Sequence, residues 1–161
     1  MASLASQQYY GHPQNQFWRI LQAIWPSSPM NTFVDSYQKR SEWLLARQIG
    51  VWDVYASCER EGSLDSRIRQ PVMNDFSEVI RRCPALEAIA HNGAESFKHA
   101  RHVSAASAGN GRNAENRTAS VAASPCVLFY QLPSSSAANA AWSFERKLIH
   151  WREIFQKHGL V

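Results

Sequence analysis

The clearest pattern along the chain is an apolar stripe near its start. The stripe has the i, i+3, i+4, i+7 spacing of one helix face, and its members are Phe17, Ile20, Leu21 and Ile24. Pro13 suits the first turn of such a helix, and the proline-rich run at 25–29 ends it. We therefore expect an amphipathic helix between these two points.

Other stretches of the chain also favour helices. They are residues 36–48, 74–83, 94–103 and 139–157. Asn74 has the residue type of an N-cap, and Pro84 stops the helix that follows it. In the last stretch, the expected buried residues are Trp142, Leu148, Trp151 and Phe155.

Short, mostly apolar runs lie between these helices. They are residues 49–55, 86–91 and 125–131, and they are typical of strands buried on both faces of a parallel sheet. The alternation of helices and strands predicts an α/β protein, a three-layer α/β/α sandwich with a short central parallel sheet. The polar stretches 58–71 and 104–124 are expected to be loops, and the low complexity of the second predicts a flexible one.

Composition agrees with one soluble globular domain. The chain has 161 residues, of which 45% are hydrophobic and 19% charged, so we expect a single domain over 1–161. The net charge is +4. A positive excess favours an anionic partner, and nucleic acid is the common one.

Cysteine and histidine usage bears on compartment and metals. The three cysteines are an odd number without a Cys-x-x-Cys pair, which favours a reducing compartment over a disulfide framework: Cys58, Cys83 and Cys126. The six histidines lack zinc-site spacing, and three cysteines cannot hold a four-cysteine iron–sulfur cluster. We therefore predict neither a metal nor a cofactor.

Membrane and export signals are not visible in the sequence. No apolar run approaches the ~20 residues that span a bilayer. The chain does not open on the pattern of a signal peptide. The expected location is the cytoplasm, at the nucleoid if the anionic partner is DNA.

Most of the candidate chemistry lies in the stretch 9–18. Its residues are Tyr9-Tyr10-Gly11-His12-Pro13-Gln14-Asn15-Gln16-Phe17-Trp18. This order resembles the Tyr-Tyr-x-His-Pro-x-Asn-x-Phe-Trp segment of the hypoxanthine-DNA (deoxyinosine) glycosylases, a branch of the uracil-DNA glycosylase superfamily. Three further segments match the branch: residues 52–66, Asn92-Gly93 and residues 132–136. The resemblance covers most of the chain.

The resemblance also implies a feature of the sheet. In the family, a buried strand and a small Gly/Pro turn precede the Tyr-Tyr segment, and this sequence begins after both. The expected sheet therefore lacks its first, central strand, and such a loss exposes hydrogen-bonding edges on both neighbours.

The family's site residues carry over to matching positions. Asn15 is the implied catalytic residue, and the segment around it forms part of the base pocket. The implied base-binding residues are Tyr10, His12, Phe17, Asp53 and Asn92. The implied contacts to DNA phosphates are Ser134, Ser135 and Ser136, whose hydroxyls and backbone N–H groups would form an anion site at the start of the next helix.

Several of these residues also have a structural interpretation. Phe17 and Trp18 could be core residues of an amphipathic helix. Asp53 could cap a helix or brace a loop. His12 could be a structural histidine before Pro13, and the serines 134–136 could form only an N-cap.

The activity that the resemblance implies is hydrolysis of an N-glycosidic bond after the damaged nucleotide is flipped from the DNA stack. The expected partner is double- or single-stranded DNA with a deaminated base, most readily hypoxanthine, and the expected state is a monomer. The alternatives are a uracil or thymine mismatch-type glycosylase of the same fold, a truncated DNA-binding relic without catalysis, and, more remotely, a hydrolase of free inosine.

Overall fold

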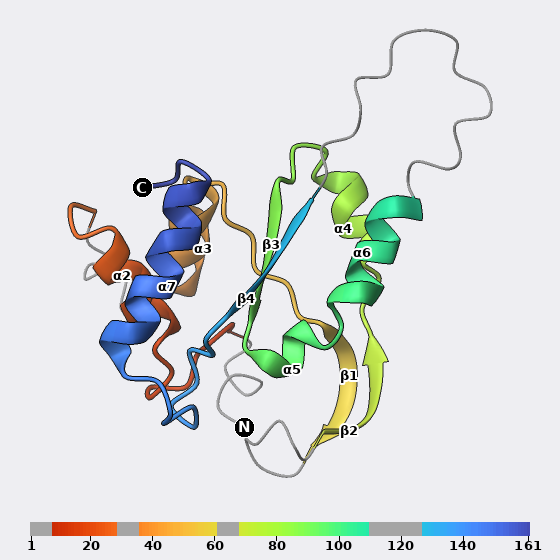
Figure 1. Cartoon of the computed structure of the whole chain (residues 1–161), viewed down its shortest axis with the longest axis horizontal. Coiled ribbons are helices and arrows are strands. Elements are labelled where there is room, and N and C mark those ends of the chain that lie inside the picture. Colours follow the sequence, from red (N-terminus) through yellow and green to blue (C-terminus); the bar gives the residue numbers. More distant parts are fainter. Residues whose placement is uncertain (1–7, 29–35, 61–67, 110–126) are drawn as a thin grey trace, which may run out of the picture.

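The computed structural model describes residues 8–28, 36–60, 68–109 and 127–161, and these form three layers. The middle layer is the parallel pair β3 (Ala88–Asn92) and β4 (Leu128–Leu132), which run in register from Ala88 beside Leu128 to Asn92 beside Leu132. Helices cover both sides of this pair (Figure 1). The predicted α/β/α sandwich is confirmed.

One helical layer contains α2 (Phe17–Ile24), α3 (Tyr37–Leu45) and α7 (Phe144–Lys157). All three lie where the sequence predicts helices. The helix predicted from residue 139 begins later, because the Ser143 side chain accepts a hydrogen bond from the Arg146 backbone N–H and so caps α7 at 143. Residues 133–143 therefore form a loop between β4 and α7.

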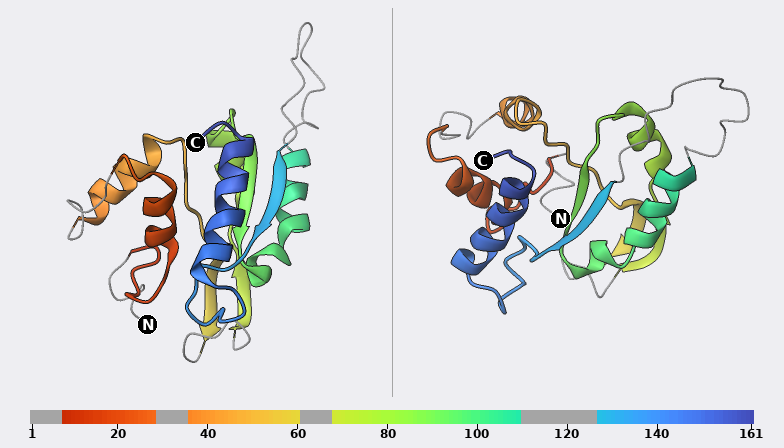
Figure 2. Two further views of the ribbon diagram at one scale, coloured as in Figure 1. Left: turned by 60° about the vertical axis from the view of Figure 1, so that its left-hand side comes forward. Right: turned by 45° about the horizontal axis from the view of Figure 1, so that its top comes forward.

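The opposite layer contains α4 (Phe76–Arg82), α5 (Ala94–Phe97) and α6 (Ala100–Gly109) (Figure 2). The single helix predicted at 94–103 is thus two helices, and α6 runs into the stretch predicted as a loop from residue 104. The remainder of that predicted loop, from residue 110, lies outside the described residues.

The start of α4 differs from the prediction by one residue. The N-cap is Asp75, whose carboxylate accepts hydrogen bonds from the backbone N–H and the hydroxyl of Ser77. Asn74, the predicted cap, instead donates its side-chain amide to the Asp53 carbonyl at 2.8 Å. Asn74 therefore ties the start of α4 to the segment that carries Asp53.

The strand predicted at 49–55 is wrong. The first strand that the structure describes is β1 (Tyr55–Arg60), which begins where the predicted strand ends. It pairs antiparallel with β2 (Ile68–Met73), so a hairpin occupies much of the stretch predicted as a loop at 58–71. Two register shifts interrupt this ladder. A hairpin needs only a local partner, so polar strands that lack an apolar run can still pair.

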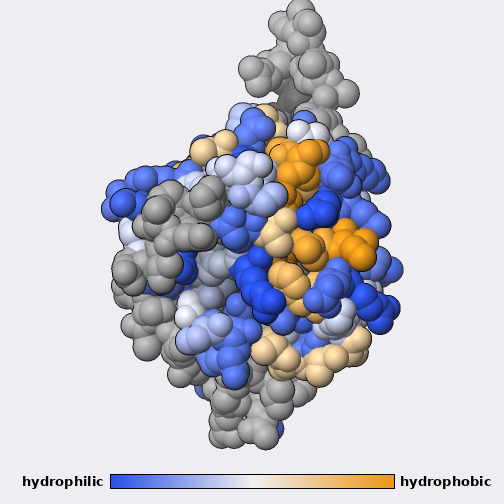
Figure 3. Space-filling model, turned by 90° about the vertical axis from the view of Figure 1, so that its left-hand side faces the viewer, coloured by the Kyte–Doolittle hydropathy of each residue, from blue (hydrophilic) through white to orange (hydrophobic). Residues whose placement is uncertain are grey.

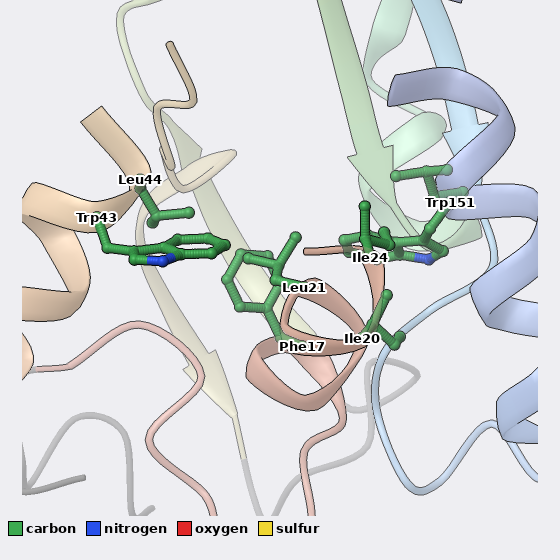
Figure 4. Close-up of a cluster of buried hydrophobic side chains, with 8 residues drawn as sticks. Phe17, Ile20, Leu21, Ile24, Trp43, Leu44 and Trp151 are labelled. Carbon is green, nitrogen blue, oxygen red and sulfur yellow. The ribbon is translucent and has the colours of Figure 1, made fainter. Parts of the chain in front are cut away.

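The main hydrophobic core lies between α2, α3, α7 and the end of β4. Its buried members are Phe17, Ile20, Leu21, Ile24, Trp43, Leu44, Leu132 and Trp151. Figure 4 shows α2 between the side chains of Trp43 and Leu44 on one side and Trp151 on the other. The predicted apolar stripe of α2 is therefore the face that joins this layer to the sheet.

The outer surface of the layer formed by α2, α3 and α7 is largely hydrophilic, with a hydrophobic area on one part of it (Figure 3). On α7, Ile149 is an exposed apolar residue. Across the described residues, no helix has the length and apolar character needed to cross a membrane.

We predict that Gly93→Ala destabilises the protein by about 1–3 kcal/mol, because only glycine adopts this backbone conformation without strain. Gly93 follows β3 with φ 107° and ψ 165°, and an added Cβ would lie 3.0 Å from the Ser134 Cβ. Gly50→Ala is the matched control, since an added Cβ there meets nothing within 4 Å. Urea unfolding of both variants measures the difference, and equal stabilities would contradict the prediction.

Candidate active site

Three segments that are far apart in the sequence meet where β3 and β4 end. Asn92 ends β3 and pairs with Leu132 at the end of β4. The loop before α2 arrives at the same place, where the Gln16 backbone N–H donates to the Ser135 carbonyl at 2.9 Å. Ligands of open parallel sheets bind in the crevice at the carboxyl ends of the strands. This corner is therefore the candidate active site.

A hydrogen-bond network joins Asn15, Asn92 and Ser135 at this corner. The Ser135 Oγ lies 2.9 Å from Asn15 Oδ1 and 2.8 Å from Asn92 Nδ2. The Ser135 backbone N–H donates to Asn92 Oδ1 at 2.8 Å. The Ser135 side chain is 0% exposed. Three of the predicted site residues therefore form one hydrogen-bond network around a buried serine hydroxyl.

Tyr10 covers Phe17 at the edge of this network. Their rings stack with centroids 4.0 Å apart and planes 19° from parallel. Burial raises the pKa of the Tyr10 hydroxyl to about 12, against the opposing effect of its hydrogen bond with the Asn92 side chain. Tyr10 also has φ 55°, which is uncommon for a residue other than glycine.

The predicted stacking role of Phe17 does not fit this arrangement. Phe17 is 5% exposed and belongs to the core, and the edges of Trp18 and Trp151 also meet its ring. A base could reach Phe17 only after Tyr10 had moved. The structural interpretation of Phe17 is therefore the better one, and Tyr10 is the aromatic residue placed toward the site.

Asp53 lies near the two tyrosines although no strand carries it there. Burial raises the pKa of the Tyr9 and Tyr10 hydroxyls, and the negative charge of Asp53 adds to the rise at each. Asp53 is an exposed residue, but the protein around its carboxyl group removes enough water to raise the pKa of that group. The role of Asp53 at the edge of a bound base stays a prediction.

The serine loop, residues 133–136, differs from the prediction in two ways. It is not the mouth of a helix, because α7 begins at Phe144. Ser135 cannot contact a phosphate from its buried position, so that assignment is corrected. Ser134 Oγ accepts from the Ser136 N–H, and Ser136 Oγ accepts from the Ala138 N–H. These two hydroxyls, which are only partly buried, remain the candidate phosphate contacts.

Comparison with known proteins identifies the family. No protein-family model matches the chain. A protein of Methanosarcina acetivorans named hypoxanthine DNA glycosylase is 32% identical over 154 residues, which are 96% of this chain and 83% of that protein. The chain belongs to the hypoxanthine DNA glycosylase family. A second protein of this name, from Methanosarcina barkeri, is 38% identical over 97 residues, which are 60% of each chain.

A solved structure supports the same assignment. It is a solution NMR structure of a Methanosarcina acetivorans protein named as a candidate uracil DNA glycosylase. The two chains are 32% identical and superpose with a TM-score of 0.70 over 96% of this chain and 82% of that one. The predicted branch of the uracil-DNA glycosylase superfamily is confirmed.

His12 braces the turn that leads to Asn15, whose backbone N–H donates to the His12 carbonyl at 2.9 Å. It is exposed, and its Nδ1 accepts a hydrogen bond from the Gln14 backbone N–H at 3.2 Å. This contact supports the structural interpretation of the histidine. A base contact from the remaining ring nitrogen stays a prediction.

The sequence analysis did not identify Lys147, which contacts two segments of the site. It is 1% exposed, and its Nζ donates to the Ser136 carbonyl at 3.1 Å and to Gln16 Oε1 at 3.0 Å. Burial lowers the pKa of the Lys147 ammonium group. Its spacing of four from Trp151 on α7 could have revealed it, since these are the two buried residues of that helix. Lys147 joins the serine loop to the segment before α2.

His91 is buried beside the site but points away from it. Neighbouring strand residues alternate between faces, so His91 and Asn92 lie on opposite sides of β3. The His91 ring is 3% exposed and lies 2.9 Å from Ser96 Oγ. Among the described residues, no group of three or more His, Cys, Asp or Glu side chains could hold a metal ion.

We predict that His91 makes the protein less stable as the pH falls. Burial lowers the pKa of His91 below 6.5, so from pH 6.5 downward the unfolded chain binds the proton more readily than the folded one. Stability is therefore lost as the pH falls from 6.5 toward the lowered pKa. Urea unfolding at pH 7.5 and pH 5 should show a smaller loss for His91→Phe than for the wild type.

The exposed His102 supplies the control for this pH effect. His102→Gln should lose as much stability as the wild type between the two pH values. If His91→Phe also loses as much as the wild type, His91 does not account for the acid sensitivity.

Proposed function

We propose that this chain hydrolyses the N-glycosidic bond of deoxyinosine in DNA, releasing hypoxanthine and leaving an abasic site. The observation that carries the proposal is the convergence of Asn15, Asn92 and Ser135 at the ends of β3 and β4, in a chain of the hypoxanthine DNA glycosylase family. The proposed partner is double- or single-stranded DNA that carries the deaminated base, bound by one copy of the chain.

Access to the bond requires base flipping. The glycosidic carbon is hidden inside a duplex, so the nucleotide must leave the stack before water can attack. The hydroxyls of Ser134 and Ser136 lie beside the corner and can bind the flanking phosphates. The net charge of +4 favours approach to DNA in general.

In the proposed reaction, Asn15 orients the attacking water and does not act as a base. A carboxamide is too weak a base to deprotonate water, so its contribution must come from orientation. A sugar that reacts as an oxocarbenium-like cation needs little push from the nucleophile. In the proposed reaction, Asn15 holds the attacking water while negative charge builds on the departing purine and is stabilised by hydrogen-bond donors nearby.

Tyr10 is the proposed stacking platform for the flipped base. Phe17 supports its ring from behind, and Asn92 binds its hydroxyl. A ring held on two sides loses little further freedom when a base stacks on it. Tyr10→Ala should therefore lower activity on lesion DNA more than Tyr10→Phe, which keeps the ring.

Asp53 is the proposed determinant of base specificity. Hypoxanthine presents an N1–H donor, whereas adenine presents a lone pair at N1. A carboxylate accepts from the donor and repels the lone pair, and such a mismatch at a polar edge allows strong rejection. The position of the Asp53 carboxylate near Tyr9 and Tyr10 supports this role.

Cleavage of a labelled duplex with one central deoxyinosine tests the activity. We expect the wild type to produce alkali-sensitive sites and Asn15→Ala to lose at least about a hundredfold in rate, since removing one positioned polar group in an active site has effects of this size. Circular dichroism must show both proteins folded. DNA binding by a folded wild type without cleavage would contradict the proposal and support the non-catalytic relic.

A second measurement tests the role of Asp53. We expect Asp53→Asn to lower the ratio of deoxyinosine to deoxyadenosine cleavage by roughly tenfold or more, because the amide no longer repels the adenine N1. An unchanged ratio would exclude Asp53 as the specificity residue.

Uracil is the second candidate substrate. The observation that favours it is the solved relative, which is named as a candidate uracil DNA glycosylase. The same assay with duplexes that carry deoxyuridine opposite guanine or adenine separates the two. Faster cleavage of deoxyuridine than of deoxyinosine would replace the proposed substrate and leave the proposed site in place.

A further inference from the structure

The hydrogen bonds around Ser135 fix the direction of each donor in the network. A backbone N–H can only donate, so the Ser135 N–H identifies the atom it meets on Asn92 as the oxygen. The other end of that amide must be the NH2 group, and it donates to Ser135 Oγ at 2.8 Å. The Ser135 hydroxyl therefore accepts from Asn92.

The Ser135 hydroxyl has one hydrogen left, and it points to Asn15. The Oγ lies 2.9 Å from Asn15 Oδ1, and the Phe17 backbone N–H donates to the same oxygen at 3.0 Å. A carbonyl oxygen has two lone pairs. Both lone pairs of the Asn15 amide oxygen are therefore taken up by the protein itself.

The Asn15 amide nitrogen has the opposite character. In the part of the chain that the structure describes, Nδ2 makes no hydrogen bond, and Asn15 is only partly buried. An NH2 group donates and cannot accept. Asn15 can therefore meet DNA or water only as a hydrogen-bond donor.

We propose that Ser135 is a positioning residue that holds Asn15 with its NH2 group toward the substrate, so that Asn15 works as a donor in the reaction. Asn92 anchors the serine, and the serine holds the Asn15 oxygen. The inference rests on the proposed glycosylase function, and it explains why a serine of the predicted phosphate loop is 0% exposed.

Asn15→Asp tests the donor role. Aspartate has nearly the same shape and keeps an oxygen for Ser135 and Phe17, but it replaces the NH2 donor with a second acceptor. We expect Asn15→Asp to lose as much of the single-turnover rate on deoxyinosine DNA as Asn15→Ala, within about a factor of ten. A rate equal to or above that of the wild type would overturn the proposal, because it would mean that Asn15 acts as an acceptor.

Ser135→Ala tests the positioning role. Loss of one hydrogen bond on the Asn15 oxygen should lower the single-turnover rate about tenfold and leave the affinity for the duplex unchanged. A phosphate contact predicts the opposite, a weaker affinity with the rate at saturation retained. That result, or a wild-type rate, would overturn the proposal.

A double-mutant cycle separates positioning from a general effect on folding. If Ser135 acts through Asn15, adding Ser135→Ala to Asn15→Ala should cause no further loss of rate. An equal tenfold loss in both backgrounds would show a structural role and overturn the proposal. Ser104→Ala, on an exposed position of α6, is the control variant that should keep the wild-type rate.

NMR of the free protein tests the network without any reaction. We expect the side-chain amide resonances of Asn15 to move in Ser135→Ala and to stay in place in Ser104→Ala. Unmoved resonances in Ser135→Ala would overturn the hydrogen bond on which the inference depends. If the wild type cleaves neither deoxyinosine nor deoxyuridine, the proposed function fails, and this measurement still decides whether Ser135 orients Asn15.

Discussion

The contact of the buried Ser135 with Asn15 and Asn92 is the interaction on which the site depends. Ser135 is 43 residues from Asn92 and 120 from Asn15, so one hydroxyl joins three distant parts of the chain. Ser135 is fully buried and its two partners are partly buried, and a buried polar group left without a partner costs about 1–3 kcal/mol. The network therefore stabilises a single arrangement of the loops, and the same arrangement leaves the Asn15 NH2 group available.

The sequence reveals the layers of this fold better than it reveals their connections. The stripe of α2 shows its helical period, and the apolar runs of β3 and β4 are typical of buried parallel strands. Each lies close to its predicted place. The hairpin of β1 and β2 is polar and irregular, so its pairing leaves no periodic trace. The apolar run that ends at Tyr55 forms no strand over 49–54. There the Ile49 N–H donates to the Leu44 carbonyl, and the Val54 carbonyl accepts from the Asn74 N–H.

The candidate site was predictable as a set of residues but not as a geometry. Motif order alone indicates Asn15, Asn92 and the serine loop. It cannot show that Ser135 is buried while its neighbours are less so, because three serines in a row look alike in sequence. The stacking of Tyr10 on Phe17 and the contacts of Lys147 with Gln16 and Ser136 also depend on tertiary packing. Conformation therefore separates the direct contacts from the residues that support them.

The central claim is that a deaminated base is excised at the corner formed by Asn15, Asn92 and Ser135. An NMR titration with a duplex that contains one 2′-fluoro-deoxyinosine, whose glycosidic bond resists hydrolysis, tests it most directly. The account predicts that the amide resonances of Asn15, Gly93 and Ser134 shift with this duplex and not with a matched deoxyadenosine duplex. Lesion-dependent shifts confined to α6 or to the hairpin of β1 and β2 would contradict it.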